Sequence, residues 1–123
     1  MNLKMNQTKQ LLEAVIKGLQ EKKGKRIRVV DLTKLSGAIC EYMVIGEGTN
    51  PNQLHALSDS VWNIARVSVN EKPISVDGDR NSPWIGLDYG TVLVHLFLPE
   101  QRAFYDLEHL WADSKITEIP DLD

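Results

Sequence analysis

The chain has 123 residues, of which 42% are hydrophobic and 25% are charged, and these proportions are ordinary for a soluble globular protein. This length predicts one domain over residues 1–123 with a single hydrophobic core. The formal net charge at pH 7 is −3, whereas nucleic-acid-binding domains are usually strongly basic. We therefore expect little direct contact with nucleic acid.

Cys40 is the only cysteine, which excludes a disulfide within the chain and favours a reducing compartment. No apolar run approaches the roughly 20 residues of a membrane span, and the N-terminus lacks the apolar segment of a signal peptide. A cytoplasmic protein without membrane attachment is expected. Cys40 and the histidines show no metal-ligand spacing, so we expect neither a metal nor another cofactor; the histidines are His55, His95 and His109.

The first half of the chain predicts a helix, two strands and a second helix. Apolar residues recur on one helical face within residues 1–24. Runs of β-branched residues over 27–32 and 42–45 indicate short strands. Asn50 followed by Pro51 is typical of a helix cap and first turn, so a second helix should begin there.

Five basic residues gather where the first helix should end and the first strand begin. They would complement the partial negative charge at a helix C-terminus, or they would form a patch that contacts RNA. We favour the first interpretation; the residues are Lys22, Lys23, Lys25, Arg26 and Arg28.

The second half of the chain predicts three strands and a helix. Residues 73–76 resemble a short strand, and the Gly, Asp, Asn and Ser residues of 77–83 indicate an exposed loop. Residues 84–87 and 92–98 form a predicted hairpin, and Gly90 supplies the positive φ that its turn needs. The strand predicted over residues 92–98 has apolar side chains on both of its faces, as expected for a central strand that is covered on both sides.

The last predicted helix begins at Pro99. Its expected buried stripe consists of Phe104, Leu107, Leu110 and Trp111, and the core of the domain should span residues 7–111. Residues 112–123 are expected to form a polar, acidic tail. The result is an α/β fold of order αββαβββα, in which a single mixed five-stranded sheet is flanked by helices.

The segment from Trp84 to Gly90 is the strongest candidate for a functional surface. In a strand, Trp84, Gly86 and Asp88 share one face, so the indole lies beside a residue without a side chain. Tyr89 is expected at the tip of the turn, exposed to solvent. Exposed Trp and Tyr side chains indicate a protein interface, although a helix or loop that covers Trp84 would fit the same spacing.

Two other segments could carry chemistry, and neither indicates an enzyme. The glycine-rich corner at residues 46–50 precedes a helix and could face an anion, but it lacks the lysine of a phosphate-binding loop. Asp77 and Asp79 lie in a loop, where turn formation explains them better than acid–base catalysis does. No nucleophile motif is present.

Taken together, several motifs resemble the ribosomal silencing factor family, also called Iojap-like or RsfS. The resemblance covers residues 7–111. It departs from the family pattern at residues 39–41 and at residues 51–52, so no role is carried over to the corner between the second strand and the second helix. The matching residues are Asp31-Leu32, Tyr42-Met43-Val44-Ile45, Gly48-Thr49-Asn50, the run from Trp84 to Gly90, Val92, Val94-His95-Leu96-Phe97, Pro99-Glu100-Gln101-Arg102, Tyr105, Leu107-Glu108 and Leu110-Trp111.

The resemblance implies a protein that binds the large ribosomal subunit through its ribosomal protein fourteen. By occupying that surface, such a protein would block joining of the small subunit and lower translation when nutrients are short. It also implies a possible homodimer. It places the centre of the contact surface at Trp84, Asp88 and Tyr89. Four further residues either join this centre or brace it from the last helix; they are Arg102, Tyr105, Glu108 and Trp111.

The family fold is similar to that of nucleotidyltransferases. This similarity supplies an alternative function, that of an enzyme that transfers phosphoryl groups with Mg²⁺. Such an enzyme needs an acidic pair on a strand after its glycine-rich loop, and the residues after Gly48-Thr49 supply none. A homodimeric adaptor without a ribosomal role is the third hypothesis.

Overall fold

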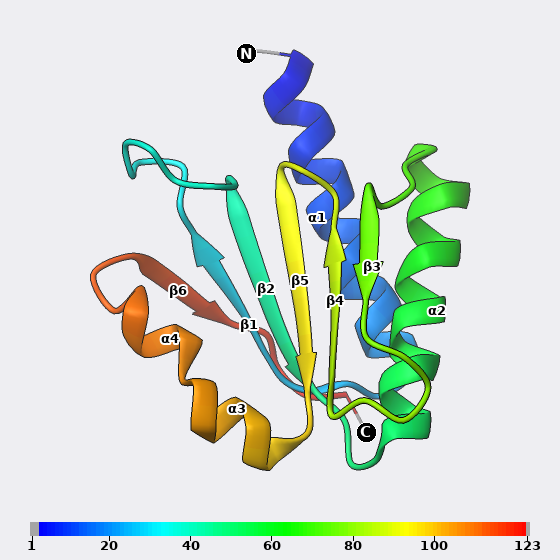
Figure 1. Cartoon of the computed structure of the whole chain (residues 1–123). Helices are drawn as coiled ribbons and strands as arrows, with labels where there is room; N and C mark the ends of the chain where they lie inside the picture. The colour runs from blue at the N-terminus through cyan, green and yellow to red at the C-terminus, as the bar shows by residue number, and fades with distance from the viewer. Residues whose placement is uncertain (1–2, 123) are drawn as a thin grey trace.

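The computed structural model describes residues 3–122 as one central sheet with helices on both of its faces (Figure 1). The order of helices and strands predicted for the first 98 residues is confirmed. In chain order the elements are α1 (Leu3–Glu21), β1 (Lys25–Asp31), β2 (Tyr42–Glu47), α2 (Pro51–Val69), β3 (Ser75–Asp77), β4 (Trp84–Asp88), β5 (Val92–Phe97), α3 (Pro99–Tyr105), α4 (Leu107–Leu110) and β6 (Lys115–Glu118).

The sheet is mixed, and its strand order is β3-β4-β5-β2-β1-β6. β2 and β5 run parallel at its centre, and every other neighbouring pair is antiparallel. The predicted turn between β4 and β5 is confirmed, because Gly90 has a φ of 84° and the amide of Tyr89 donates to the carbonyl of Val92. The predicted start of α2 is also confirmed: the Asn50 side chain accepts a hydrogen bond from the amide of Gln53 at 2.9 Å.

One face of the sheet is closed by α1 and α2, which pack against each other and against the central strands. Gly18 allows the two helices to approach, since a Cβ there would lie 2.8 Å from the Cα of Val61. The Ser60 hydroxyl donates to the Gly18 carbonyl at 2.7 Å across the same contact. The core between the helices and this face includes Leu11, Val15, Leu19, Leu54, Leu57, Val61, Val44, Val94 and Leu96, all fully buried.

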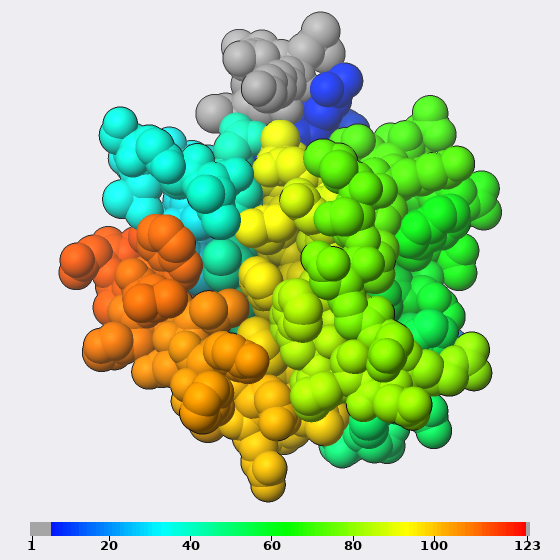
Figure 2. Space-filling model, in the orientation of Figure 1, coloured from blue at the N-terminus to red at the C-terminus, as the bar shows by residue number. Residues whose placement is uncertain are grey.

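The other face carries the shorter helices α3 and α4 near one end of the strands (Figure 1). A second hydrophobic cluster lies there, and its buried members include Val30, Ile45 and Phe97. Side chains of β5, yellow in Figure 2, remain visible between the orange segment and the green strands. This face is therefore only partly covered.

The prediction of five strands and a polar tail is wrong, because residues Lys115–Glu118 form a sixth strand, β6, beside β1. Only Ile116 of this strand packs into the second cluster. An edge strand that buries one apolar side chain lacks the strong alternation from which strands are predicted. Its polar sequence therefore resembles a tail.

The predicted helix after Pro99 is interrupted, and its expected buried stripe is wrong at two of its four positions, Phe104 and Leu110. Asp106 has a φ of 46°, in the left-handed region, and this ends α3 before α4 begins. Phe104, in α3 before the break, is 82% exposed, and Leu110, in α4 after it, is 69% exposed. Leu107 and Trp111 do pack against the second cluster, as predicted.

Candidate partner-binding site

An apolar groove of about 220 Å³ opens on the partly covered face, between β4, β5 and the α3–α4 segment. Ring systems form most of its wall. The rings of Trp84 and His95 are stacked at 6.0 Å between centroids, those of His95 and Phe97 also at 6.0 Å, and Tyr105 lies 5.8 Å from Phe97. We call this site the aromatic groove; its lining residues are Trp84, His95, Phe97, Tyr105 and Leu107.

Gly86 positions the indole of Trp84 in the groove. In the β4–β5 register Gly86 is paired with His95, whereas Trp84 is paired with Phe97. A Cβ at Gly86 would lie 2.6 Å from Cζ2 of Trp84, so the indole occupies the space that a side chain would fill. The prediction that the indole lies beside the bare glycine is confirmed, and the contact brings the indole to His95.

His95 accepts a hydrogen bond at Nδ1 from Nε1 of Trp84 at 3.1 Å. Burial in the groove lowers the pKa of His95, because a charged imidazole is poorly solvated there. An imidazole that accepts at Nδ1 is in its neutral form, and burial favours the same form. The hydrogen-bond partner of His95 is a side chain of the neighbouring strand β4.

Arg102 attaches α3 to the sheet. Its side chain is buried, and Nη1 donates to the carbonyl of Arg26 at 2.6 Å and lies 3.3 Å from the carboxylate of Glu47. Its Nη2 donates to Glu108 at 2.8 Å. Because Glu108 belongs to α4, one guanidinium holds both sides of the helix break against β1 and β2.

Glu108 joins this attachment to the C-terminal strand. Its carboxylate accepts hydrogen bonds from both Arg102 and Arg28, each at 2.8 Å, and Arg28 also donates to Glu118 of β6 at 2.8 Å. Burial by itself would raise the pKa of Glu108, but the hydrogen bonds and charges of the two arginines outweigh it and hold the pKa below its usual range. Arg102 and Glu108 therefore brace the groove.

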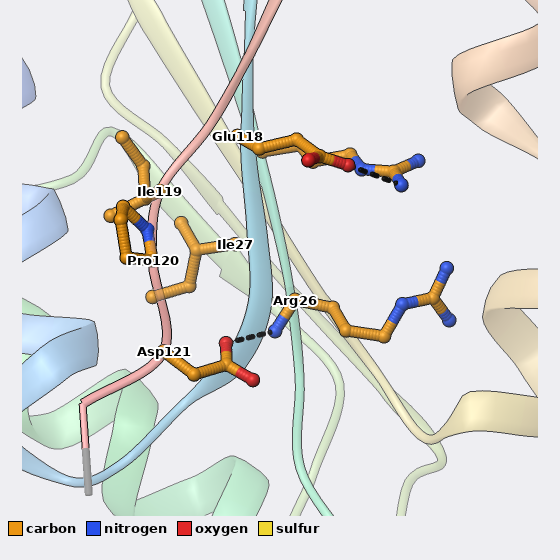
Figure 3. A pocket seen from close by; sticks show the side chains of 7 residues that line it. Arg26, Ile27, Glu118, Ile119, Pro120 and Asp121 are labelled. Atoms are coloured by element: carbon orange, nitrogen blue, oxygen red, sulfur yellow. Dashed lines mark hydrogen bonds and ion pairs between the residues drawn. The ribbon is translucent and has the colours of Figure 1, made fainter.

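A second hollow, of about 360 Å³, lies where β1 meets β6 and the C-terminal residues (Figure 3). The amide of Arg26, which has a φ of 49°, donates to the carboxylate of Asp121 at 2.9 Å. The guanidinium groups of Arg26 and Arg28 in its wall are paired with Glu47, Glu108 and Glu118. These two arginines are therefore paired with carboxylates, an arrangement that neither of our two interpretations of the basic cluster predicted.

Tyr89 does not lie where the sequence analysis placed it. The prediction of an exposed ring at the turn tip is wrong, because Tyr89 is only 7% exposed and packs into the core on the α1–α2 side. Burial, together with the negative charge of Glu71, raises the pKa of its phenol to about 12. The backbone of the turn points the ring inward, so Tyr89 lies on the face opposite the groove.

Asp88 shares the face of Trp84 but occupies the other end of β4. The two residues are four steps apart along the strand, which is roughly 13 Å. The Asp88 carboxylate accepts a hydrogen bond from the amide of Gly90 at 2.7 Å. This bond stabilises the β4–β5 turn. The expected centre at Trp84, Asp88 and Tyr89 is therefore divided, and only Trp84 lies in the groove.

The two segments considered for chemistry have structural partners. Gln53 of α2 accepts hydrogen bonds from the amide and hydroxyl of Thr49 in the glycine-rich corner. In the loop before β4, the Asp79 carboxylate accepts from the amide of Asn81 and the hydroxyl of Ser82, as the turn interpretation predicts. Within residues 3–122, no group of three or more acidic, His or Cys side chains could hold a metal ion, and no helix is long and apolar enough to cross a membrane.

Tyr105 and Trp111 are both near the groove, but only Tyr105 lines it. Tyr105 is 55% exposed, and Trp111 is half-buried in the second cluster. Sequence reasoning missed His95, Phe97 and Leu107 as groove residues. The available signal was the alternation of β5, which places His95 and Phe97 on one face, but the register that brings them beside Trp84 is not visible in a single strand.

Comparison with known proteins identifies relatives along nearly the whole chain. The family model described as "Ribosomal silencing factor during starvation" matches residues 5–123. A protein from Chromobacterium violaceum named ribosomal silencing factor RsfS is 31% identical over 109 residues, which cover 86% of this chain and 85% of the relative. A mouse protein named mitochondrial assembly of ribosomal large subunit protein 1 is 34% identical over 85 residues, covering 64% of this chain and 37% of the mouse protein.

A solved structure supports the same grouping. The crystal structure of a protein from Chromobacterium violaceum superposes with a TM-score of 0.78 at 29% sequence identity, covering 91% of this chain and 92% of that chain. The mixed sheet flanked by helices is thus shared with an experimentally determined structure.

Proposed function

Because the chain belongs to the ribosomal silencing factor family RsfS, we propose that it binds the large ribosomal subunit and keeps the small subunit from joining. The proposed result is lower translation when nutrients are short, which fits the words "during starvation" in the description of the family. The blocking is steric and takes place in the cytoplasm.

The observation that carries this proposal is the aromatic groove. Trp and Tyr side chains that are only partly covered are the residue types that dominate protein–protein hot spots. In this chain Trp84 and Tyr105 lie at two sides of one hollow, on a sheet face that α3 and α4 leave partly open. We propose Trp84 and Tyr105 as contact residues, with Arg102, Glu108 and Trp111 as their support.

We propose ribosomal protein fourteen of the large subunit as the partner at this groove. The name of the mouse relative refers to the large subunit, which supports this choice of subunit. Asp88 and Tyr89 are not proposed as groove contacts, because the former holds a turn and the latter is buried.

The test is co-sedimentation of the protein with purified bacterial large subunits and with joined ribosomes. We expect wild-type protein to travel with isolated large subunits only, and Trp84→Ala to lower its affinity by at least about tenfold, a hot-spot effect. Val67→Ala is the matched control, since Val67 is 74% exposed on α2. A wild-type protein that does not sediment with large subunits, or equal binding by the two variants, would contradict the proposal.

Self-association as a homodimer is a second proposal for the same face. Phe104 and Leu110 expose most of their apolar side chains beside the groove, and such side chains often mark interfaces. Analytical ultracentrifugation of wild-type protein and Phe104→Ser should show a dimer only for the wild type. A monomeric wild type would exclude this proposal.

The likeness to the nucleotidyltransferase fold stays a prediction. The alternative function, an enzyme of that kind, is tested by incubating the protein with labelled nucleotides, Mg²⁺ and total RNA. We expect no transfer, since we assign the protein a binding role.

A further inference from the structure

The hydrogen bond between Trp84 and His95 fixes the proton on the imidazole. The indole Nε1 can only donate a hydrogen bond, so Nδ1 of His95, 3.1 Å away, must be the acceptor. A neutral imidazole that accepts at Nδ1 carries its proton on Nε2. In the free protein His95 is therefore held as the Nε2–H tautomer.

The Nε2–H donor is open for a partner. Within residues 3–122 no group accepts a hydrogen bond from it. A fully enclosed side-chain nitrogen or oxygen without a hydrogen bond is found at the Tyr89 hydroxyl and not at His95. Nε2 is therefore reached by solvent. His95 itself lines the groove, and the other lining residues supply two aromatic rings, a phenol and a leucine. A ligand that fills the groove must therefore either supply an acceptor for this N–H or leave a desolvated donor unpaired, which is costly.

The size of the groove indicates what fills it. At about 220 Å³ it is smaller than the roughly 300–1,000 Å³ of sites that hold small molecules and cofactors. It suits one large apolar side chain with part of its backbone.

The charges next to the groove favour a protein segment over RNA. A phosphate backbone would need free cations, but Arg26, Arg28 and Arg102 are each paired with a glutamate carboxylate, and the chain carries a net charge of −3.

We infer that His95 is a specificity-determining residue, whose Nε2–H donates to a backbone carbonyl oxygen of a partner protein segment that inserts an apolar side chain into the aromatic groove. Trp84 acts here in two ways, as a wall of the groove and as the donor that orients the imidazole. This inference rests on the proposed function, since the segment is taken to belong to a protein of the large subunit.

Two substitutions separate the two nitrogens. His95→Asn keeps a polar atom near the position of Nδ1 for Trp84 but does not reach the position of Nε2. His95→Gln places its amide nitrogen near the position of Nε2. His95→Phe keeps the ring stack and removes both nitrogens, and its apolar ring suits the buried site, so it guards against loss of folding.

The measurement is affinity for purified bacterial large subunits, with circular dichroism to confirm folding. We expect His95→Asn and His95→Phe to bind about tenfold more weakly, as for a lost partner of a desolvated donor, and His95→Gln to stay within about threefold of wild type. If His95→Asn and His95→Phe bind as tightly as wild type, the inference is overturned while the proposed function stands. If wild type does not bind large subunits, both are overturned.

The tautomer is tested in the free protein by ¹⁵N NMR of the imidazole. The Nε2–H form is expected in wild type and a mixture of tautomers in Trp84→Phe; an Nδ1–H form in wild type would overturn the inference. Binding to protein-free ribosomal RNA that is lost in His95→Phe would overturn the choice of a protein partner.

Discussion

The two faces of the sheet differ in how completely they are covered, although the same six strands build both. On one face, two 19-residue helices enclose fully buried leucine and valine side chains. On the other, helices of 7 and 4 residues cover part of the strands and leave the aromatic groove. The closed face supplies stability, whereas the partly covered face is held by ionic and hydrogen-bonded contacts and remains available to a partner.

The strongest test of this contrast places the same substitution on both faces. Leu57→Ala removes a fully buried side chain between α2 and the sheet and should lower the free energy of unfolding by about 2–5 kcal/mol. Leu110→Ala, at a side chain that is 69% exposed, should change it by less than about 0.5 kcal/mol. Urea unfolding followed by circular dichroism measures both, and similar losses would show that the two faces do not differ as described.

Replacement of Arg102 should show how the partly covered face is held together. Arg102→Met leaves buried carboxylate and carbonyl groups without their donor and should cost about 3 kcal/mol. Arg26→Met is the control, because the Arg26 side chain is 57% exposed and its ion pair should contribute at most about 1 kcal/mol. Equal unfolding free energies for the two variants would show that Arg102 does not hold α3 and α4 against the sheet.

Gly86→Ala should disturb the groove more than the fold. The new Cβ would displace the indole of Trp84 from His95, which costs about 1–3 kcal/mol as overpacking and should also weaken large-subunit binding. Gly46→Ala is the matched strand control, since a Cβ there makes only ordinary contacts of 3.5 Å or more. Unchanged binding by Gly86→Ala would mean that the indole position is not needed.

The smallest expected effect is on pH dependence. Because the pKa of Glu108 is lower in the folded protein than its usual value of 4.5, its contribution to stability is present above about pH 4.5 and is lost as the pH falls through the lowered value. Glu108→Gln should therefore flatten the fall in unfolding free energy below pH 5. If the unfolding free energy of this variant falls with pH as steeply as that of the wild type, protonation of Glu108 does not cause the loss of stability.

The sequence predicted the order of elements well where hydrophobic period and turn residues agree, as at Asn50 and Gly90. The resemblance to the RsfS family is confirmed, and the indole beside Gly86 follows from strand alternation alone. β6 could not be predicted because its single packed residue, Ile116, produces no pattern.

The candidate site was predicted less well, because its geometry depends on contacts between distant segments. At the helix break, Asp106 adopts a left-handed backbone conformation although it is not a glycine. Nothing in the sequence around Asp106 marked this position as the end of a helix. Tyr89 was misplaced because a turn position indicates where the backbone lies and not which way the ring points. Arg102 and Glu108 were named, but their pairing with each other and with Arg28 follows only from the folded chain.

The central claim is that the partly covered face is the one that binds the large subunit. It is tested most directly by placing a photo-crosslinking amino acid at Tyr105, which lines the groove, or at Val67 on α2, and irradiating each protein with purified large subunits. We expect a crosslink from position 105 to one large-subunit protein and none from position 67. Crosslinks from position 67 alone would show that the closed side of the molecule faces the ribosome and would contradict this account.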